Sequence, residues 1–144
     1  MNTLYSTLLT LHGLLAIAVL VLMPVLILLY VGRKAAVGRV SAIAIPLLHL
    51  QFVIGLYLYF AGTNGFELFQ VEGVMKDSNL RFYAVEHIST MIIAIVLLSL
   101  GRIRLKKQLK LQQKLTNGPL KLFVLGFLLL LSRVPWEKWP FVGQ

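Results

Sequence analysis

Each of the three histidines in the chain lies within a long apolar stretch: His12, His49 and His87. Neutral imidazole is a common ligand of metals, haem iron included. Segment 75–87 also carries Arg81 and Glu86 from a polar loop into the apolar run that contains the third histidine. Ionisable groups inside a membrane are costly and mark functional sites. These residue types therefore indicate a metal or haem site built inside a membrane.

The composition supports a membrane location for these stretches. The chain has 144 residues, of which 58% are hydrophobic and 13% are charged, whereas a soluble domain is nearer 45–50% apolar and about 25% charged. Apolar stretches cover about residues 8–31, 40–60, 80–100 and 118–134. A span needs about 20 residues, so the fourth stretch crosses only if Lys121 and Arg133 extend to opposite interfaces. There is no cysteine, which excludes a thiolate metal site.

The charged residues predict the orientation. Two loops hold ten of the fourteen basic residues: Arg33, Lys34, Arg39, Arg102, Arg104, Lys106, Lys107, Lys110, Lys114 and Lys121. Lysine and arginine favour the cytoplasmic side, so we expect both loops, including a basic segment at 102–117, in the cytoplasm. All five acidic residues fall on the other side: Glu67, Glu72, Asp77, Glu86 and Glu137. Nucleic-acid binding is a poor interpretation, because the basic residues adjoin membrane spans.

We therefore expect a single all-α domain, an integral membrane four-helix bundle with up-down-up-down topology. Both termini and a loop at 61–79 would lie outside. Asp77, Ser78 and Asn79 are candidate N-caps for the third helix. Gly13, Gly55 and Gly126 would allow close helix contacts.

The expected depths bring the histidines together. With about 1.5 Å of rise per residue, His12 and His87 each lie roughly 10 Å below the outer interface, and His49 lies roughly 16 Å below it. The first and third helices are diagonal partners in a simple bundle. His12 and His87 would then face each other across the core, with His49 just beneath. Two opposed imidazoles are what a six-coordinate b-type haem requires.

Other polar residues fit around such a haem. Arg81 and Arg133 lie near the outer rim, where they could bind the propionates. Glu86 could orient a histidine or relay protons, or simply pair with Arg81. A three-histidine copper or zinc site and plain helix-to-helix hydrogen bonds remain alternatives for the histidines, and a helix-to-helix bond is the expectation for Gln51.

Several motifs together resemble a group of small bacterial four-helix membrane proteins described as cytochrome b-like. The motifs are Met75-Lys76-Asp77, Leu80-Arg81-Phe82, Ala84-Val85-Glu86-His87, the run 91–97, His49-Leu50-Gln51 with Gly55-Leu56 and Tyr59-Phe60, Leu11-His12 with Leu14-Leu15, and Pro135-Trp136. The similarity extends over essentially the whole chain. The sequence departs from the group at Ala16, where an arginine is expected, and this weakens any propionate contact from the first helix.

The resemblance implies a multi-pass protein of the bacterial inner membrane that binds haem b and transfers electrons. We expect transfer between a membrane quinol and a partner at the outer face. One alternative is a non-enzymatic accessory or assembly subunit of a respiratory or other membrane complex. Another, a looser likeness, is a haem-dependent porphyrinogen oxidase.

Overall fold

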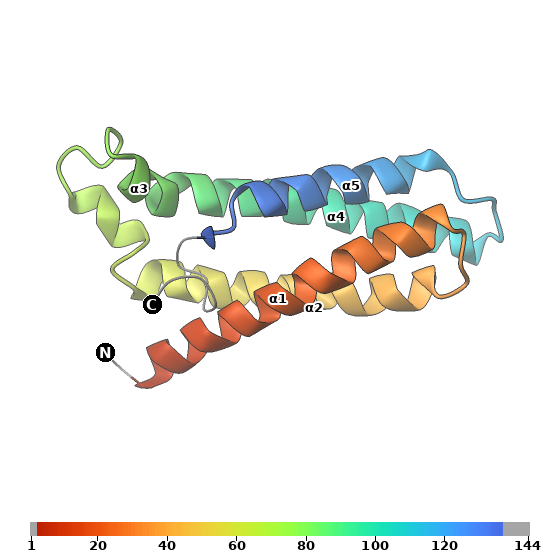
Figure 1. The fold of residues 1–144 in the computed structure, drawn as a ribbon, viewed down its shortest axis with the longest axis horizontal. Coiled ribbons are helices and arrows are strands. Elements are labelled where there is room, and N and C mark those ends of the chain that lie inside the picture. The colour runs from red at the N-terminus through yellow and green to blue at the C-terminus, as the bar shows by residue number, and fades with distance from the viewer. Residues whose placement is uncertain (1–2, 137–144) are drawn as a thin grey trace.

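The structure, a computed structural model, describes residues 3–136, and in this part of the chain it contains helices and turns but no strand. Four helical rods follow one another in alternating directions (Figure 1). Their elements are α1 (Thr3–Val31), α2 (Val37–Ala61), α3 (Ser78–Arg81), η2 (Phe82–Glu86), α4 (His87–Lys110) and α5 (Asn117–Ser132), and a short helix, η1 (Phe66–Gln70), lies between α2 and α3. The all-helical prediction is therefore confirmed. Glu137 lies outside the described residues.

The third rod is longer than the sequence predicted. The elements α3, η2 and α4 form one continuous helix from Ser78 to Lys110, whereas the apolar stretch suggested about residues 80–100. Most of the basic segment expected at 102–117 is therefore the continuation of α4. It packs on the bundle through Leu105, which is fully buried, and through Leu109, which lies against Gly38 of α2.

Three helical segments are long and apolar enough to cross a membrane: Thr3–Val31, Val37–Gln70 and Ser78–Lys110. The helix α5 is apolar but shorter, with 16 residues, or about 24 Å at 1.5 Å per residue. Large apolar side chains are exposed on the outside of the rods, for example Leu28 at 70% and Phe60 at 63%. These lengths and surfaces are those of a membrane protein.

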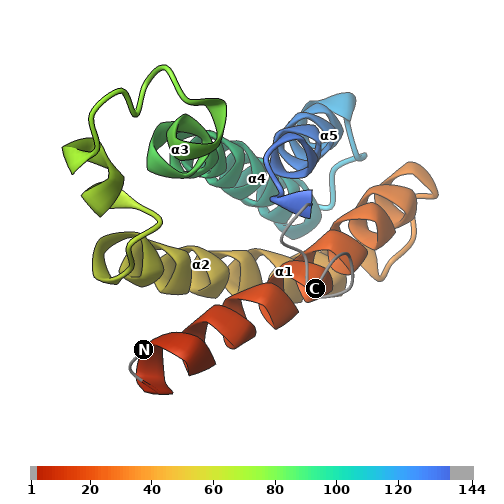
Figure 2. The ribbon, with the colours of Figure 1, turned by 60° about the vertical axis from the view of Figure 1, so that its left-hand side comes forward.

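The rods form two antiparallel pairs, α1 with α2 and α4 with α5, which lie over one another (Figure 2). The pairs meet where α2 packs on α4 and α1 packs on α5. One end of the bundle holds the two short connections, at residues 32–36 and 111–116, and we call it the basic end. The opposite end holds segment 62–77, and we call it the acidic end.

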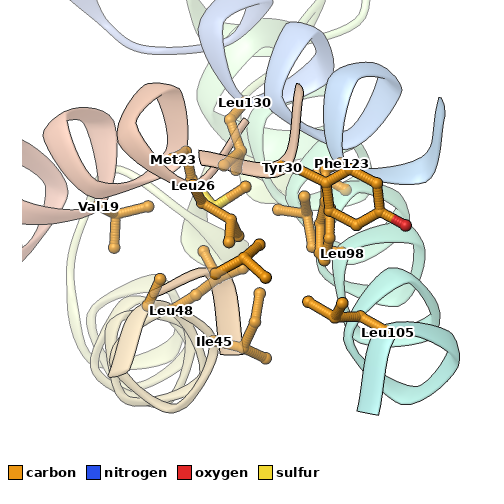
Figure 3. Packing of buried hydrophobic residues seen from close by; sticks show 13 residues of the cluster. Val19, Met23, Leu26, Tyr30, Ile45, Leu48, Leu98, Leu105, Phe123 and Leu130 are labelled. Carbon is orange, nitrogen blue, oxygen red and sulfur yellow. The ribbon is translucent and has the colours of Figure 1, made fainter. Parts of the chain in front are cut away.

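The main hydrophobic core extends from the middle of the bundle toward the basic end, and Figure 3 shows how its side chains pack. Its residues come from all four rods: Val19, Met23, Leu26, Tyr30, Val37, Ala44, Ile45, Leu48, Ala94, Leu98, Leu105, Phe123 and Leu130. Close packing there needs Gly126, because a Cβ at that position would lie 2.6 Å from Leu98 Cγ. The close contact expected at Gly13 is wrong, since nothing lies within 4 Å of a Cβ placed there.

The half nearer the acidic end is packed differently. No residue of α1 before Val19 is fully buried, so the first half of that helix is only partly covered, mainly where Tyr5 and His12 pack on glycines of the second rod and its loop. A second, small cluster joins Leu68 and Val74 of the connecting segment to Ala84 of η2. This cluster attaches the loop between α2 and α3 to the start of the third rod. All of the polar side chains considered next, except His49 and its partner Ser99, belong to this half.

Candidate site in the acidic half of the bundle

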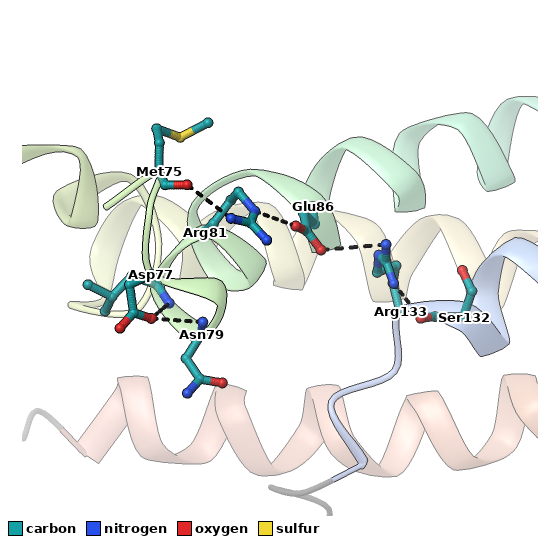
Figure 4. A network of polar contacts seen from close by, with 8 residues as sticks. Met75, Asp77, Asn79, Arg81, Glu86, Ser132 and Arg133 are labelled. Atoms are coloured by element: carbon teal, nitrogen blue, oxygen red, sulfur yellow. Dashed lines mark hydrogen bonds and ion pairs between the residues drawn. The ribbon is translucent and has the colours of Figure 1, made fainter. Parts of the chain in front are cut away.

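The third rod begins with a capped turn. The carboxylate of Asp77 accepts hydrogen bonds from the backbone N–H groups of Asn79 and Leu80, at 2.8 and 2.9 Å, which satisfies donors that a helix start leaves free. Of the three candidate N-caps, Asp77 is the one that caps the helix. The cap fixes the residue at which the helix starts. It therefore also fixes the position along the helix axis of every polar residue that follows (Figure 4).

One turn after the cap, the helix widens. Residues Phe82–Glu86 form a single π-helical turn, a feature often found at functional sites. In an α-helix, residues five apart point about 140° away from each other, so Arg81 and Glu86 could not meet. The wide turn brings positions i and i+5 to the same side, and Arg81 Nε lies 2.7 Å from Glu86 Oε1. The expected pair of these two residues is therefore confirmed.

The second rod supports this wide turn. The Tyr59 hydroxyl donates a hydrogen bond of 2.8 Å to the backbone carbonyl of Ala84. The backbone of Tyr59 also packs against Gly65, where a Cβ would come within 2.2 Å of the Tyr59 carbonyl oxygen. The end of α2, the connecting loop and the wide turn thus pack as one unit.

Glu86 links the third rod to the end of α5. Its second carboxylate oxygen, Oε2, lies 3.5 Å from the guanidinium of Arg133, so one carboxylate bridges two arginines (Figure 4). The arginine side chains are 37% and 41% exposed and that of Glu86 is 28% exposed. The cluster of Arg81, Glu86 and Arg133 therefore carries one net positive charge at the rim of the bundle. Within residues 3–136 no hydrogen bond joins Glu86 to a histidine.

His87, the next residue along the chain, binds the main chain of that same arginine. Its Nδ1 lies 2.7 Å from the carbonyl oxygen of Arg133, and because a carbonyl only accepts, Nδ1 is the protonated nitrogen. The lone pair of the neutral ring is then on Nε2, for which the described residues provide no hydrogen bond. A backbone carbonyl on Nδ1 is the usual way to set a histidine for ligation through Nε2.

His12 lies against α2 in the same half. A Cβ on Gly55 would come within 2.7 Å of His12 Cε1, so the ring packs directly on the glycine. His12 Nδ1 is buried without a hydrogen-bond partner, and so is Gln51 Oε1, one turn away on α2. The helix-to-helix bond expected for this glutamine is therefore not made by its carbonyl oxygen.

His49 occupies a different setting. Its Nδ1 donates to the Ile45 carbonyl at 2.8 Å, and its Nε2 accepts from the Ser99 hydroxyl at 3.1 Å. Both ring nitrogens are therefore satisfied by a bond within α2 and a bond to α4. Ser99 follows His87 by twelve residues, or roughly 18 Å along the helix.

The expectation that His49 lies just beneath the other two histidines is therefore wrong. The expected depths assume that the second apolar stretch, 40–60, ends level with the start of the third, 80–100. The bond from Tyr59 to Ala84 shows instead that the third rod extends beyond the end of α2. Among residues 3–136, no group of three or more histidine and acidic side chains could hold a metal ion, so the three histidines do not converge on a copper or zinc site there.

No family model, curated protein or solved structure matches the chain. The function must therefore be argued from the site itself. That site consists of two imidazoles on diagonal rods, a buried amide beside one of them and an arginine cluster at the rim. It can supply two nitrogen ligands and bind carboxylates. The carbonyl of Arg133 is the contributor that sequence reasoning missed, because a main-chain acceptor has no signature in the sequence.

Proposed function

We propose that this is a multi-pass protein of the bacterial inner membrane that binds a b-type haem between His12 and His87 and transfers electrons. The observation that carries the proposal is the hydrogen bond from His87 Nδ1 to the Arg133 carbonyl, which leaves Nε2 as the free donor atom of the ring. The proposal also includes an orientation in the membrane, with the basic end facing the cytoplasm and both chain termini facing outward.

The residues around the two histidines fit a haem. An unpartnered polar atom in a buried position is unfavourable, and both His12 Nδ1 and Gln51 Oε1 are in that state. No residue of α1 ahead of Val19 belongs to the main core. The two imidazoles therefore lie outside the main core, in the half of the bundle where α1 is only partly covered.

The arginine cluster would hold the propionate groups. Arg81 and Arg133 share only one carboxylate, and each guanidinium has five N–H donors, so both retain donors for a further anion. Glu86 holds the two arginines in place. A bound b-type haem supplies one-electron chemistry at its iron, and these residues supply ligation, burial and charge. The electron donor and acceptor in this proposal are a membrane quinol and a partner at the outer face.

The deciding experiment is a reduced-minus-oxidised spectrum of the purified protein after expression with ample haem. We expect a b-type band that His12→Ala and His87→Ala remove. His49→Ala is the matched control and keeps the band, because both nitrogens of that ring are used elsewhere. His12→Met keeps an iron ligand and shifts the band. A folded wild-type protein without the band, or a band that survives both ligand variants, would contradict the proposal.

A second function is favoured by His49. Its bonds to Ile45 and Ser99 are those of a structural helix contact, which is the role expected of all three histidines in a non-enzymatic accessory subunit of a membrane complex. In that case alanine at each histidine lowers the stability of the bundle, and no cofactor is found in any variant.

A further inference from the structure

The basic end carries an uncompensated positive charge. Its ten cationic side chains are those of Arg33, Lys34, Arg39, Arg102, Arg104, Lys106, Lys107, Lys110, Lys114 and Lys121. Both ion pairs of residues 3–136 lie instead at the acidic end, and no acidic residue lies near the two basic loops in the sequence. A dense cationic surface of this kind binds an anionic partner.

Large apolar side chains lie among these cations. Ile103 is 63% exposed, Leu111 is 52% exposed and Val31 is 62% exposed. A surface that mixes basic and exposed aliphatic residues suits the boundary between lipid headgroups and acyl chains. An acidic soluble partner would match the charges but leave these aliphatic residues without a suitable environment. The mixture therefore favours anionic lipid.

A small notch gives this surface a defined binding position. It has a volume of about 130 Å³ and lies between the end of α1 and the start of α5. Its lining residues are Tyr30, Val31, Arg33, Leu115, Asn117 and Leu120. The guanidinium and the amide can bind a phosphate, and the aliphatic residues can contact the adjoining glycerol and acyl carbons.

The walls of the notch are tied together by hydrogen bonds. The Tyr30 hydroxyl lies 2.8 Å from the Thr116 carbonyl and 3.3 Å from Gln108 Oε1, and Gln108 Nε2 lies 2.7 Å from Thr116 Oγ1. These contacts join the ends of α1 and α4 to the loop that leads into α5. The notch is therefore formed before any ligand arrives.

Arg33 is held in an unfavourable backbone conformation. Its φ is 50°, in the left-handed region where glycine is preferred. It ends α1 in a turn closed by a hydrogen bond of 2.9 Å from Lys34 N to the Leu29 carbonyl. A strained residue with a charged side chain at a notch points to a role for that side chain. Gln112 takes the same conformation, with φ 52°, after α4, and does not line the notch.

We propose that the basic end binds anionic phospholipids and that the notch receives one headgroup phosphate on Arg33 and Asn117. This binding does not depend on a haem. It follows from the charge, the interleaved aliphatic residues and the position of the arginine at the notch.

The test is thermal unfolding of the purified protein in detergent, titrated with phosphatidylglycerol or with phosphatidylcholine of the same acyl chains. We expect only phosphatidylglycerol to raise the melting temperature, and added salt to reduce the effect. Arg33→Gly removes the charge and also relieves the backbone strain, so it folds. It should weaken phosphatidylglycerol binding about fivefold, as expected for one basic residue near an anionic surface.

Two variants serve as controls. Gln112→Gly relieves the same kind of strain without removing a charge, and Lys76→Gln removes a charge at the acidic end, so both should respond to phosphatidylglycerol like the wild type. Equal responses to the two lipids, or an unchanged response in Arg33→Gly, would overturn the proposal. So would polyglutamate raising the melting temperature as much as phosphatidylglycerol, since that result indicates an acidic protein partner.

Discussion

The imidazole of His87 donates a hydrogen bond of 2.7 Å to the backbone carbonyl of Arg133, while the preceding residue, Glu86, binds the side chain of the same arginine. Two adjacent residues of the third rod thus hold both the main chain and the side chain of one residue at the end of α5. This double contact joins the two rods at the acidic end, beyond the main core. It also sets the ring orientation on which the proposed haem ligation depends.

Replacing Glu86 with glutamine should loosen this contact. The variant loses two ion pairs, and because the groups are partly exposed, each pair contributes little to stability. We expect a modestly lower melting temperature in detergent and, if haem is bound, a change in its midpoint potential. Glu72→Gln is the control, since Glu72 is exposed and forms no ion pair within residues 3–136. Identical behaviour of the two variants would argue against a positioning role for Glu86.

A methyl group at Gly55 should displace His12. The added Cβ would lie 2.7 Å from His12 Cε1, and overpacking of this kind costs about 1–3 kcal/mol. Gly55→Ala should therefore unfold at a lower temperature and bind less haem per chain. Gly13→Ala is the matched control, because its Cβ enters open space and alanine favours a helix by about 1 kcal/mol over glycine. If both variants behave alike, the ring of His12 is not fixed by the glycine.

His49 and Ser99 should show direct energetic coupling. Their hydrogen bond of 3.1 Å joins α2 to α4, and such bonds in membrane proteins average about 0.6 kcal/mol in double-mutant cycles. Unfolding of His49→Ala, Ser99→Ala and the double variant should give a coupling energy of that size. A coupling energy near zero would show that the bond does not contribute to stability.

The Tyr30 hydroxyl should stabilise the basic end. Tyr30 is 3% exposed, and its hydroxyl donates to the Thr116 carbonyl while its ring packs on Phe123. Tyr30→Phe keeps the ring and loses the hydrogen bond, which should cost about 1 kcal/mol. Amide hydrogen exchange in loop 111–116 should increase in the variant and remain unchanged near η2. Unchanged exchange in the loop would contradict the role given to this hydroxyl.

Local features of the fold were predictable from the sequence. The long apolar runs predict the rods, the polar residues 77–79 predict a cap at the start of the third rod, and the contact at Gly55 follows from a small residue in a membrane helix. These features depend on neighbours in the chain or on composition. They need no knowledge of how one rod is placed against another.

The features that the sequence did not predict depend on the relative placement of rods. The wide turn at Phe82–Glu86 has no characteristic residue, yet it lets Arg81 reach Glu86. The position of His49 along the bundle axis, relative to His87, depends on how far the third rod extends beyond α2. The partner of His87 is a main-chain oxygen on α5. Each is a tertiary relationship that hydrophobic periodicity does not encode.

The uneven core has a consequence for assembly in the membrane. The short connections at the basic end, residues 32–36 and 111–116, make α1–α2 and α4–α5 two helical hairpins that can insert separately. Their association buries the core residues of the basic half, such as Met23 and Leu98, which are fully buried. The hairpins can therefore dock through this core alone. The proposed haem could then be added after insertion is complete, without separating the two hairpins.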